Sequence, residues 1–145
     1  LFITNLQIKP NETYSSWSLN SDDRKHKKHK GIKKSTSNAL PVSFDDFITN
    51  NKIFRKTLIK CDVDGNELIV FKSGKNYLEK YKPMIIMELA PYLYNEYGYS
   101  YQDLLNYLKQ FNYEFYDGNT YEKITDIFEY SKNIKDGSST NIFLK

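Results

Sequence analysis

Hydrophobic residues after residue 40 fall into four short runs that predict strands. Residues 58–63 and 84–89 are almost wholly apolar, a pattern typical of strands that are buried on both faces of a sheet. Residues 113–116 are rich in aromatic side chains, and residues 140–144 follow a turn signal at Asp136-Gly137-Ser138. Both stretches predict further strands.

Helical patterns separate these strands. Ser43 and Ser100 each precede an acidic residue by three positions, which is the arrangement of a helix cap. Apolar residues recur at helical spacing after Ser100 up to Asn112, a residue that tolerates the left-handed conformation that closes a helix. Helices are predicted in the stretches 43–48, 64–73, 75–81, 100–111 and 121–130. The alternation of strands and helices predicts an α/β fold with a mainly parallel sheet, whose ligands bind outside the carboxyl ends of the strands.

The first 41 residues lack this periodicity. Only residues 1–4 and 6–8 resemble strands, and residues 22–38 predict a solvated loop, because one Ile in this stretch cannot bury enough apolar surface to offset ordering. We therefore expect one partial domain over residues 1–145, with an irregular, basic, loop-rich segment at 1–41 and an αβ core at 42–145. Because the sequence starts at Leu1 rather than Met, we expect it to be part of a longer protein.

Composition narrows the setting of this domain. The chain has 145 residues, of which 39% are hydrophobic and 27% are charged, within the ordinary range of globular domains. Its single Cys excludes an intrachain disulfide. No apolar run approaches the roughly 20 residues that span a bilayer. We expect a cytoplasmic protein with no membrane partner.

Charge is concentrated in one basic run. Seven of the 21 Lys and Arg residues lie between Arg24 and Lys34, which leaves 14 basic residues against 18 acidic ones in the rest of the chain. The run offers an alternative function, the binding of a nucleic acid or another anionic polymer through phosphate contacts. It contains no aromatic residue for base stacking, so nucleic acid is not the expected partner. His26 and His29 lie among lysines that oppose a cation, so no metal ligand is assigned.

Carboxylates mark the ends of two predicted strands. Asp62 and Asp64 lie at the end of the first apolar run, and Glu88 lies at the end of the second. One interpretation is structural, with Asp64 as a helix N-cap and Glu67 completing its capping box. This interpretation does not explain Asp62, because a carboxylate at the end of an apolar strand is costly unless it faces a polar cleft.

Two chemical alternatives fit the motif poorly. A calcium loop that begins at Asp62 would need Gly where Glu67 stands and a bidentate Glu where Ser73 stands. A phosphatase of the haloacid-dehalogenase type also begins with an apolar strand that ends in Asp-x-Asp-Gly, with the first Asp as nucleophile. Such enzymes carry Thr after the Gly, and this chain has Asn66.

A longer resemblance covers residues 42–144. Five segments follow one another in this part of the chain. They are TLIKCDVDGNELIVFKSG, the strand PMIIMEL, the helix after Gly98-Tyr99-Ser100, Tyr113-Glu114-Phe115 and Asn141-Ile142-Phe143-Leu144. In this order they resemble the C-terminal half of FkbM-type methyltransferases that depend on S-adenosylmethionine. The family has Glu where this chain has Asp64, which shortens that side chain by one methylene.

The resemblance implies both a fold and a set of site residues. It implies strands four to seven of a Rossmann-like seven-stranded methyltransferase sheet, mainly parallel with the last strand antiparallel, without the Gly-rich turn that holds most of the cofactor. It implies O-methylation of a hydroxyl on a small molecule or sugar. The strand that covers residues 58–63 would expose an unpaired apolar edge. Because such edges pair with other chains, we expect a homo-oligomer. The residues that this reasoning assigns to catalysis are Asp62, Asp64 and Glu88, and those that it assigns to cofactor or substrate binding are Gly65, Glu67, Ser16 and Trp17.

Overall fold

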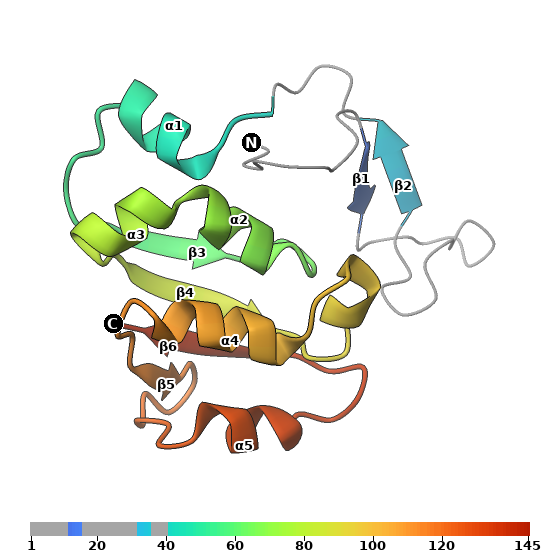
Figure 1. Ribbon diagram of the computed structural model, residues 1–145. Coiled ribbons are helices and arrows are strands. Elements are labelled where there is room, and N and C mark those ends of the chain that lie inside the picture. Colours follow the sequence, from blue (N-terminus) through green and yellow to red (C-terminus); the bar gives the residue numbers. More distant parts are fainter. Residues whose placement is uncertain (1–11, 16–31, 36–40) are drawn as a thin grey trace.

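The computed structural model describes residues 12–15, 32–35 and 41–145 (Figure 1). Strands β1 (Glu12–Ser15) and β2 (Ile32–Ser35) form an antiparallel pair in which Glu12 lies opposite Ser35. The prediction of a loop throughout residues 22–38 is therefore wrong at β2, because backbone pairing satisfies the hydrogen bonds of a polar segment without apolar burial. The strands predicted at 1–4 and 6–8, the residues Ser16 and Trp17, and the part of the basic run before β2 lie outside the described residues.

A four-stranded sheet organises residues 41–145 in the order β3-β4-β6-β5. Its strands are β3 (Leu58–Cys61), β4 (Met84–Leu89), β5 (Phe115–Asp117) and β6 (Thr140–Leu144). β3 and β4 are parallel, and β6 is antiparallel to both β4 and β5. The antiparallel last strand is confirmed. Among the described strands of this sheet, β3, β4 and β5 run in the same direction, as predicted for a mainly parallel sheet, and β6 lies between β4 and β5 in the opposite direction.

Residues 41–145 also form five α-helices and one short 3₁₀ helix, of which α1 precedes the sheet and the others connect its strands. They are α1 (Phe44–Asn50), α2 (Glu67–Ser73), α3 (Lys75–Tyr81), η2 (Tyr94–Tyr97), α4 (Tyr101–Lys109) and α5 (Ile127–Lys132). The predicted caps are confirmed: Ser43 Oγ accepts the Asp46 N–H at 3.0 Å, and Ser100 and Asp103 form a reciprocal capping box. Asn112, with a φ of 58°, ends the α4 segment as predicted.

The main hydrophobic core lies between one face of the sheet and helices α2 and α4, which cross that face in Figure 1. Along β4 the side chains alternate: Ile85, Met87 and Leu89 are buried, whereas Ile86 and Glu88 are half-buried. The prediction that this strand is buried on both faces is therefore wrong. Glu88 projects from the less covered face, which leaves its carboxylate available at the end of the strand.

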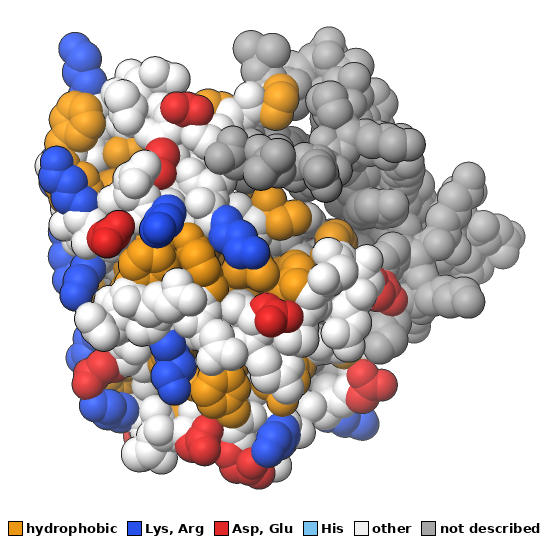
Figure 2. Space-filling view, viewed as in Figure 1, with side chains coloured by type: hydrophobic (Ala, Val, Ile, Leu, Met, Phe, Trp, Pro, Cys, Tyr) orange, Lys and Arg blue, Asp and Glu red, His pale blue; other side chains and the backbone are white. Residues whose placement is uncertain are grey.

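The outer strand β3 departs further from its predicted burial. Its Leu58 side chain is 55% exposed, and Cys61 alone among the four residues is buried. The cause is its place at the end of the sheet, where β4 is its pairing partner. Figure 2 shows apolar, basic and acidic side chains interspersed on the face of the molecule that carries the helices. Within the described ranges no helix has the length and apolar character of a membrane span.

Candidate functional site

The three residues predicted as catalytic meet at one edge of the sheet. Cys61, the last residue of β3, pairs in parallel with Met87, so Asp62 and Asp64 follow β3 at the level where β4 carries Glu88. Carboxylate oxygens of Asp62, Asp64 and Glu88 lie within 4.8 Å of one another. We call these three side chains the acidic cluster. Parallel pairing of β3 and β4 is what brings together residues that are distant in sequence.

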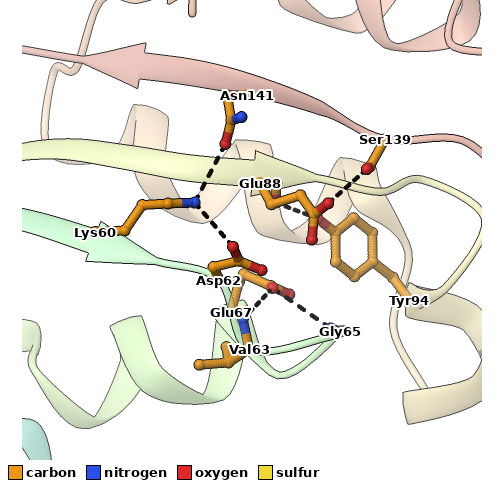
Figure 3. A network of polar contacts seen from close by, with 9 residues as sticks. All are labelled: Lys60, Asp62, Val63, Gly65, Glu67, Glu88, Tyr94, Ser139 and Asn141. Carbon is orange, nitrogen blue, oxygen red and sulfur yellow. Dashed lines mark hydrogen bonds and ion pairs between the residues drawn. The ribbon is translucent and has the colours of Figure 1, made fainter. Parts of the chain in front are cut away.

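Polar side chains from β3, from β6 and from the residue that precedes β6 contact the acidic cluster (Figure 3). Lys60 Nζ donates to Asp62 Oδ2 at 3.0 Å and to Asn141 Oδ1 at 3.2 Å. Ser139 Oγ donates to Glu88 Oε1 at 2.5 Å. Burial, followed by a hydrogen bond with the Asp62 carboxyl and by the charges of Asp62 and Asp64, raises the pKa of Glu88 above its ordinary range. Glu88 thus holds a proton more readily than an ordinary glutamate.

The loop that carries the acidic cluster has a left-handed backbone at two successive residues. Asp64 has a φ of 50° and Gly65 a φ of 93°. A Cβ at Gly65 would stand 2.4 Å from Cε2 of the Tyr97 ring. Gly65 is therefore required for its backbone conformation and for the close approach of the Tyr97 ring.

Because of this loop, α2 begins at a later residue than the sequence predicted. The helix begins at Glu67 with Asn66 as N-cap, and Asn66 makes no side-chain cap hydrogen bond. The interpretation of Asp64 as the N-cap is wrong, because two left-handed residues reorient the chain before the helix starts. Asp64 is thereby left at the sheet edge beside Asp62 and Glu88.

Glu67 is a buried carboxyl beneath the loop rather than the capping-box partner of Asp64. Its side chain is 2% exposed, and Oε1 accepts the backbone N–H groups of Val63 at 3.2 Å and Gly65 at 3.4 Å. Its second oxygen, Oε2, has no hydrogen-bond partner among the residues that the structure describes. Burial is the main cause that raises the pKa of Glu67 to about 7, and the charge of Glu88 adds to it. Glu67 therefore supports the loop from below.

Two tyrosines that the sequence analysis did not assign to the site, Tyr94 and Tyr99, contact the backbone that carries the acidic cluster. Tyr94 Oη donates to the carbonyl of Glu88 at 3.3 Å and accepts the N–H of Ala90 at 3.1 Å. Tyr99 Oη donates to the carbonyl of Gly65 at 2.6 Å. The two rings stack with centroids 5.3 Å apart, so together they join the end of β4 to the loop after β3. The concentration of tyrosines directly after the strand end at Glu88 was the available signal.

Comparison with known proteins assigns the chain to a family. The family model described as the methyltransferase FkbM domain matches residues 3–115, which is more than half of the chain and includes the acidic cluster and α4. Comparisons with curated proteins and with solved structures find no significant match. The match begins within the segment in which the sequence resembles the family least, and it ends before β6. The chain belongs to the FkbM methyltransferase family.

Proposed function

We propose that this protein transfers a methyl group from S-adenosylmethionine to a hydroxyl of a small molecule or sugar, and that the acceptor binds against the acidic cluster. One observation carries the proposal: in a member of a methyltransferase family, three carboxylates from the ends of two adjacent strands lie within 4.8 Å of one another. Carboxylates are hydrogen-bond acceptors, so they suit an acceptor that presents hydroxyl groups.

The described residues do not fit the nucleoside of the cofactor. Binding of such a nucleoside uses a strand followed by a Gly-rich turn that leaves room for the ligand. In the described part of the chain, the turn after β3 contains Gly65, and the Tyr97 ring fills the space above its Cα. We therefore assign the acidic cluster to the acceptor. When bound, S-adenosylmethionine supplies an electrophilic methyl group.

The residues of this chain position the hydroxyl and receive its proton. Asp62 is held by Lys60, and Glu88 is held by Ser139 and by its place in β4, so both carboxylates are oriented before the acceptor arrives. As the acceptor oxygen takes the methyl group, the bond from that carbon to the donor sulfur breaks and the donor leaves as a neutral thioether. The hydroxyl proton of the acceptor passes to the acidic cluster. Glu88 suits this role because its raised pKa makes it a stronger base than an exposed glutamate.

Methyl transfer by the natural protein tests the proposal. Incubation with S-adenosylmethionine carrying a labelled methyl group and a panel of sugars, polyketides and other hydroxyl compounds should give a labelled product. Asp62→Asn, Asp64→Asn and Glu88→Gln should each lower the rate, by on the order of a hundredfold for the residue that takes the proton. Glu129→Gln removes an exposed carboxylate on α5 and serves as the control of equal charge change. Unchanged rates in all three cluster variants would remove the acidic cluster from the chemistry.

A further inference from the structure

We propose that Ser139 is a positioning residue for methyl transfer, whose hydroxyl fixes the Glu88 carboxylate in the orientation that receives the proton of the acceptor. The inference rests on the proposed function, because it concerns the role of Glu88 at that same site. Ser139 lies outside residues 3–115, so the match to the family model assigns it no role.

The pairing of β4 with β6 places Ser139 beside Glu88. Glu88 lies opposite Asn141, and Ser139 precedes Asn141 by two residues. Because side chains two residues apart in an extended chain point to the same face, Ser139 and Glu88 are diagonal neighbours on the less covered face of the sheet. A long side chain can bridge such neighbours, and Ser139 Oγ donates to Glu88 Oε1 at 2.5 Å. The contact joins residues that are 51 positions apart in sequence.

Asn141, the residue directly opposite Glu88, has a different partner. Its Oδ1 accepts from Lys60 Nζ at 3.2 Å, and the same Lys60 Nζ donates to Asp62 Oδ2 at 3.0 Å. Figure 3 shows Ser139 reaching Glu88 from the side of β6, whereas Asp62 lies on the side of β3. The start of β6 therefore holds both carboxylates, Glu88 directly through Ser139 and Asp62 indirectly through Asn141 and Lys60.

Glu88 requires an orienting contact because its side chain is only half-buried. A glutamate side chain has many rotamers, and packing on one side alone does not select among them. A carboxylate takes a proton only when one of its oxygens lies within hydrogen-bond distance of the reacting hydroxyl, and a displacement of about 1 Å can lower the rate about a hundredfold. The hydrogen bond from Ser139 restricts the carboxyl to one orientation before the acceptor binds.

The same hydrogen bond acts on the charge of Glu88. The titratable side chains that face Glu88 come from the loop after β3, from α2 and from the segment after β4, and they are Asp62, Asp64, Glu67 and Tyr92. Burial and the first two of these raise the pKa of Glu88, and the Ser139 hydroxyl opposes the rise because it donates to the ionised carboxylate. Ser139→Ala changes none of these groups, so a further rise in the pKa of Glu88 would report the loss of the hydroxyl.

Titration of the full chain by ¹³C NMR tests the contact without acceptor or cofactor. Glutamate carboxyl groups are labelled, and the Glu88 signal is the one that is absent from Glu88→Gln. We expect a higher pKa of Glu88 in Ser139→Ala than in the unaltered chain, and a return toward the unaltered value in Ser139→Thr, which keeps a hydroxyl. Ser138→Ala, the same change at the preceding exposed serine, should leave this pKa as it is. Equal pKa values of Glu88 in Ser139→Ala and the unaltered chain would overturn the contact.

Methyl transfer tests the positioning role itself. Ser139→Ala should lower kcat about tenfold, as for the loss of one hydrogen bond to a charged group, and should change KM little, because Ser139 does not touch the acceptor. The rise of kcat/KM with pH should move to higher pH, because Glu88 must be ionised to take the proton and its pKa is raised. Ser139→Thr should restore both quantities, and Ser138→Ala should behave like the unaltered chain.

Two outcomes separate this inference from the proposed function. The same kcat and the same pH profile in Ser139→Ala and the unaltered chain would overturn the positioning role and leave the proposed function intact. Absence of methyl transfer by the unaltered chain would remove the proposed function and the positioning role together, and the NMR titration would still show whether Ser139 binds Glu88. Circular dichroism confirms that each variant is folded, as expected for changes at exposed serines.

Discussion

The burial of Glu67 should make the stability of this protein fall as pH rises from about 5 to 8. The pKa of Glu67 is about 7 in the folded chain against an ordinary value of 4.5. Between these values the folded chain keeps the proton and the unfolded chain has lost it, so the folded state binds more protons. The stabilisation linked to this proton is complete below pH 4.5 and is lost as pH rises through 7.

The size of the effect follows from the difference between the two pKa values. One pKa unit corresponds to roughly 1.4 kcal/mol, so the free energy of unfolding should fall by about 3 kcal/mol across this window. Such a loss is a large part of the roughly 5–15 kcal/mol that stabilises a typical domain. Glu67→Gln should remove this contribution, because the amide can still accept from Val63 and Gly65 through its oxygen and carries no charge at any of these pH values.

Urea unfolding at pH 5, 6, 7 and 8 in the presence of a chelator measures the effect. The measured quantity is the difference in unfolding free energy between the unaltered chain and Glu67→Gln at each pH. The pKa of Glu88 is also raised, and taking the difference removes the part of its contribution that does not depend on the charge of Glu67. Glu129→Gln should follow the unaltered chain at every pH. A difference that stays constant from pH 5 to pH 8 would refute the assignment of a buried, proton-binding Glu67.

Three further predictions follow from the loop, the tyrosine contact and the sheet edge. Gly65→Ala should lower the free energy of unfolding by about 1–3 kcal/mol, because a Cβ would strain a φ of 93° and meet the Tyr97 ring. Chemical denaturation measures this free energy, and an unchanged denaturation midpoint would contradict the role of the ring. Tyr99→Phe should lower the free energy of unfolding by about 1–2 kcal/mol, because the Gly65 carbonyl would lose its hydrogen-bond donor. An equal loss in Tyr121→Phe, which changes an exposed tyrosine, would show that the effect is not specific to the Gly65 contact. The chain should self-associate through Phe54, which is 58% exposed, and Leu58, which is 55% exposed. Sedimentation velocity should show fewer oligomers for Leu58→Lys than for the unaltered chain. Equal sedimentation of the two chains would exclude self-association through this sheet edge.

Local signals in the sequence predicted the starts of α1 and α4 correctly, whereas the helix predicted at 121–130 begins only at Ile127. Ser43 and Ser100 cap α1 and α4 because a cap depends on residues within one turn of the helix start. The same reasoning failed at Asp64. The left-handed conformation of Asp64 and Gly65 depends on Tyr97 and Tyr99, which approach the loop from a distant part of the chain.

Burial was predicted less well than the strands themselves. The apolar run of residues 58–63 predicted a strand correctly, but its pattern did not reveal that β3 would have a single neighbour in the described sheet. The acidic cluster was predictable, because parallel strands end at a common edge and Asp62, Asp64 and Glu88 occupy those ends. Lys60, Ser139 and Asn141 could not be assigned to it, since their contacts depend on the register of β3, β4 and β6.

The central position of β6 has a consequence for how the chain folds. β6 (Thr140–Leu144) follows every other element in sequence, yet it lies between β4 and β5 and provides the pairing that joins them. During synthesis from the N-terminus, β5 has no strand of this sheet to pair with until β6 has left the ribosome. The edge at which Glu88 sits therefore takes its final form only after β6 has paired with β4. Before that moment the unpaired sides of β4 and β5 are surfaces on which nascent chains can associate incorrectly.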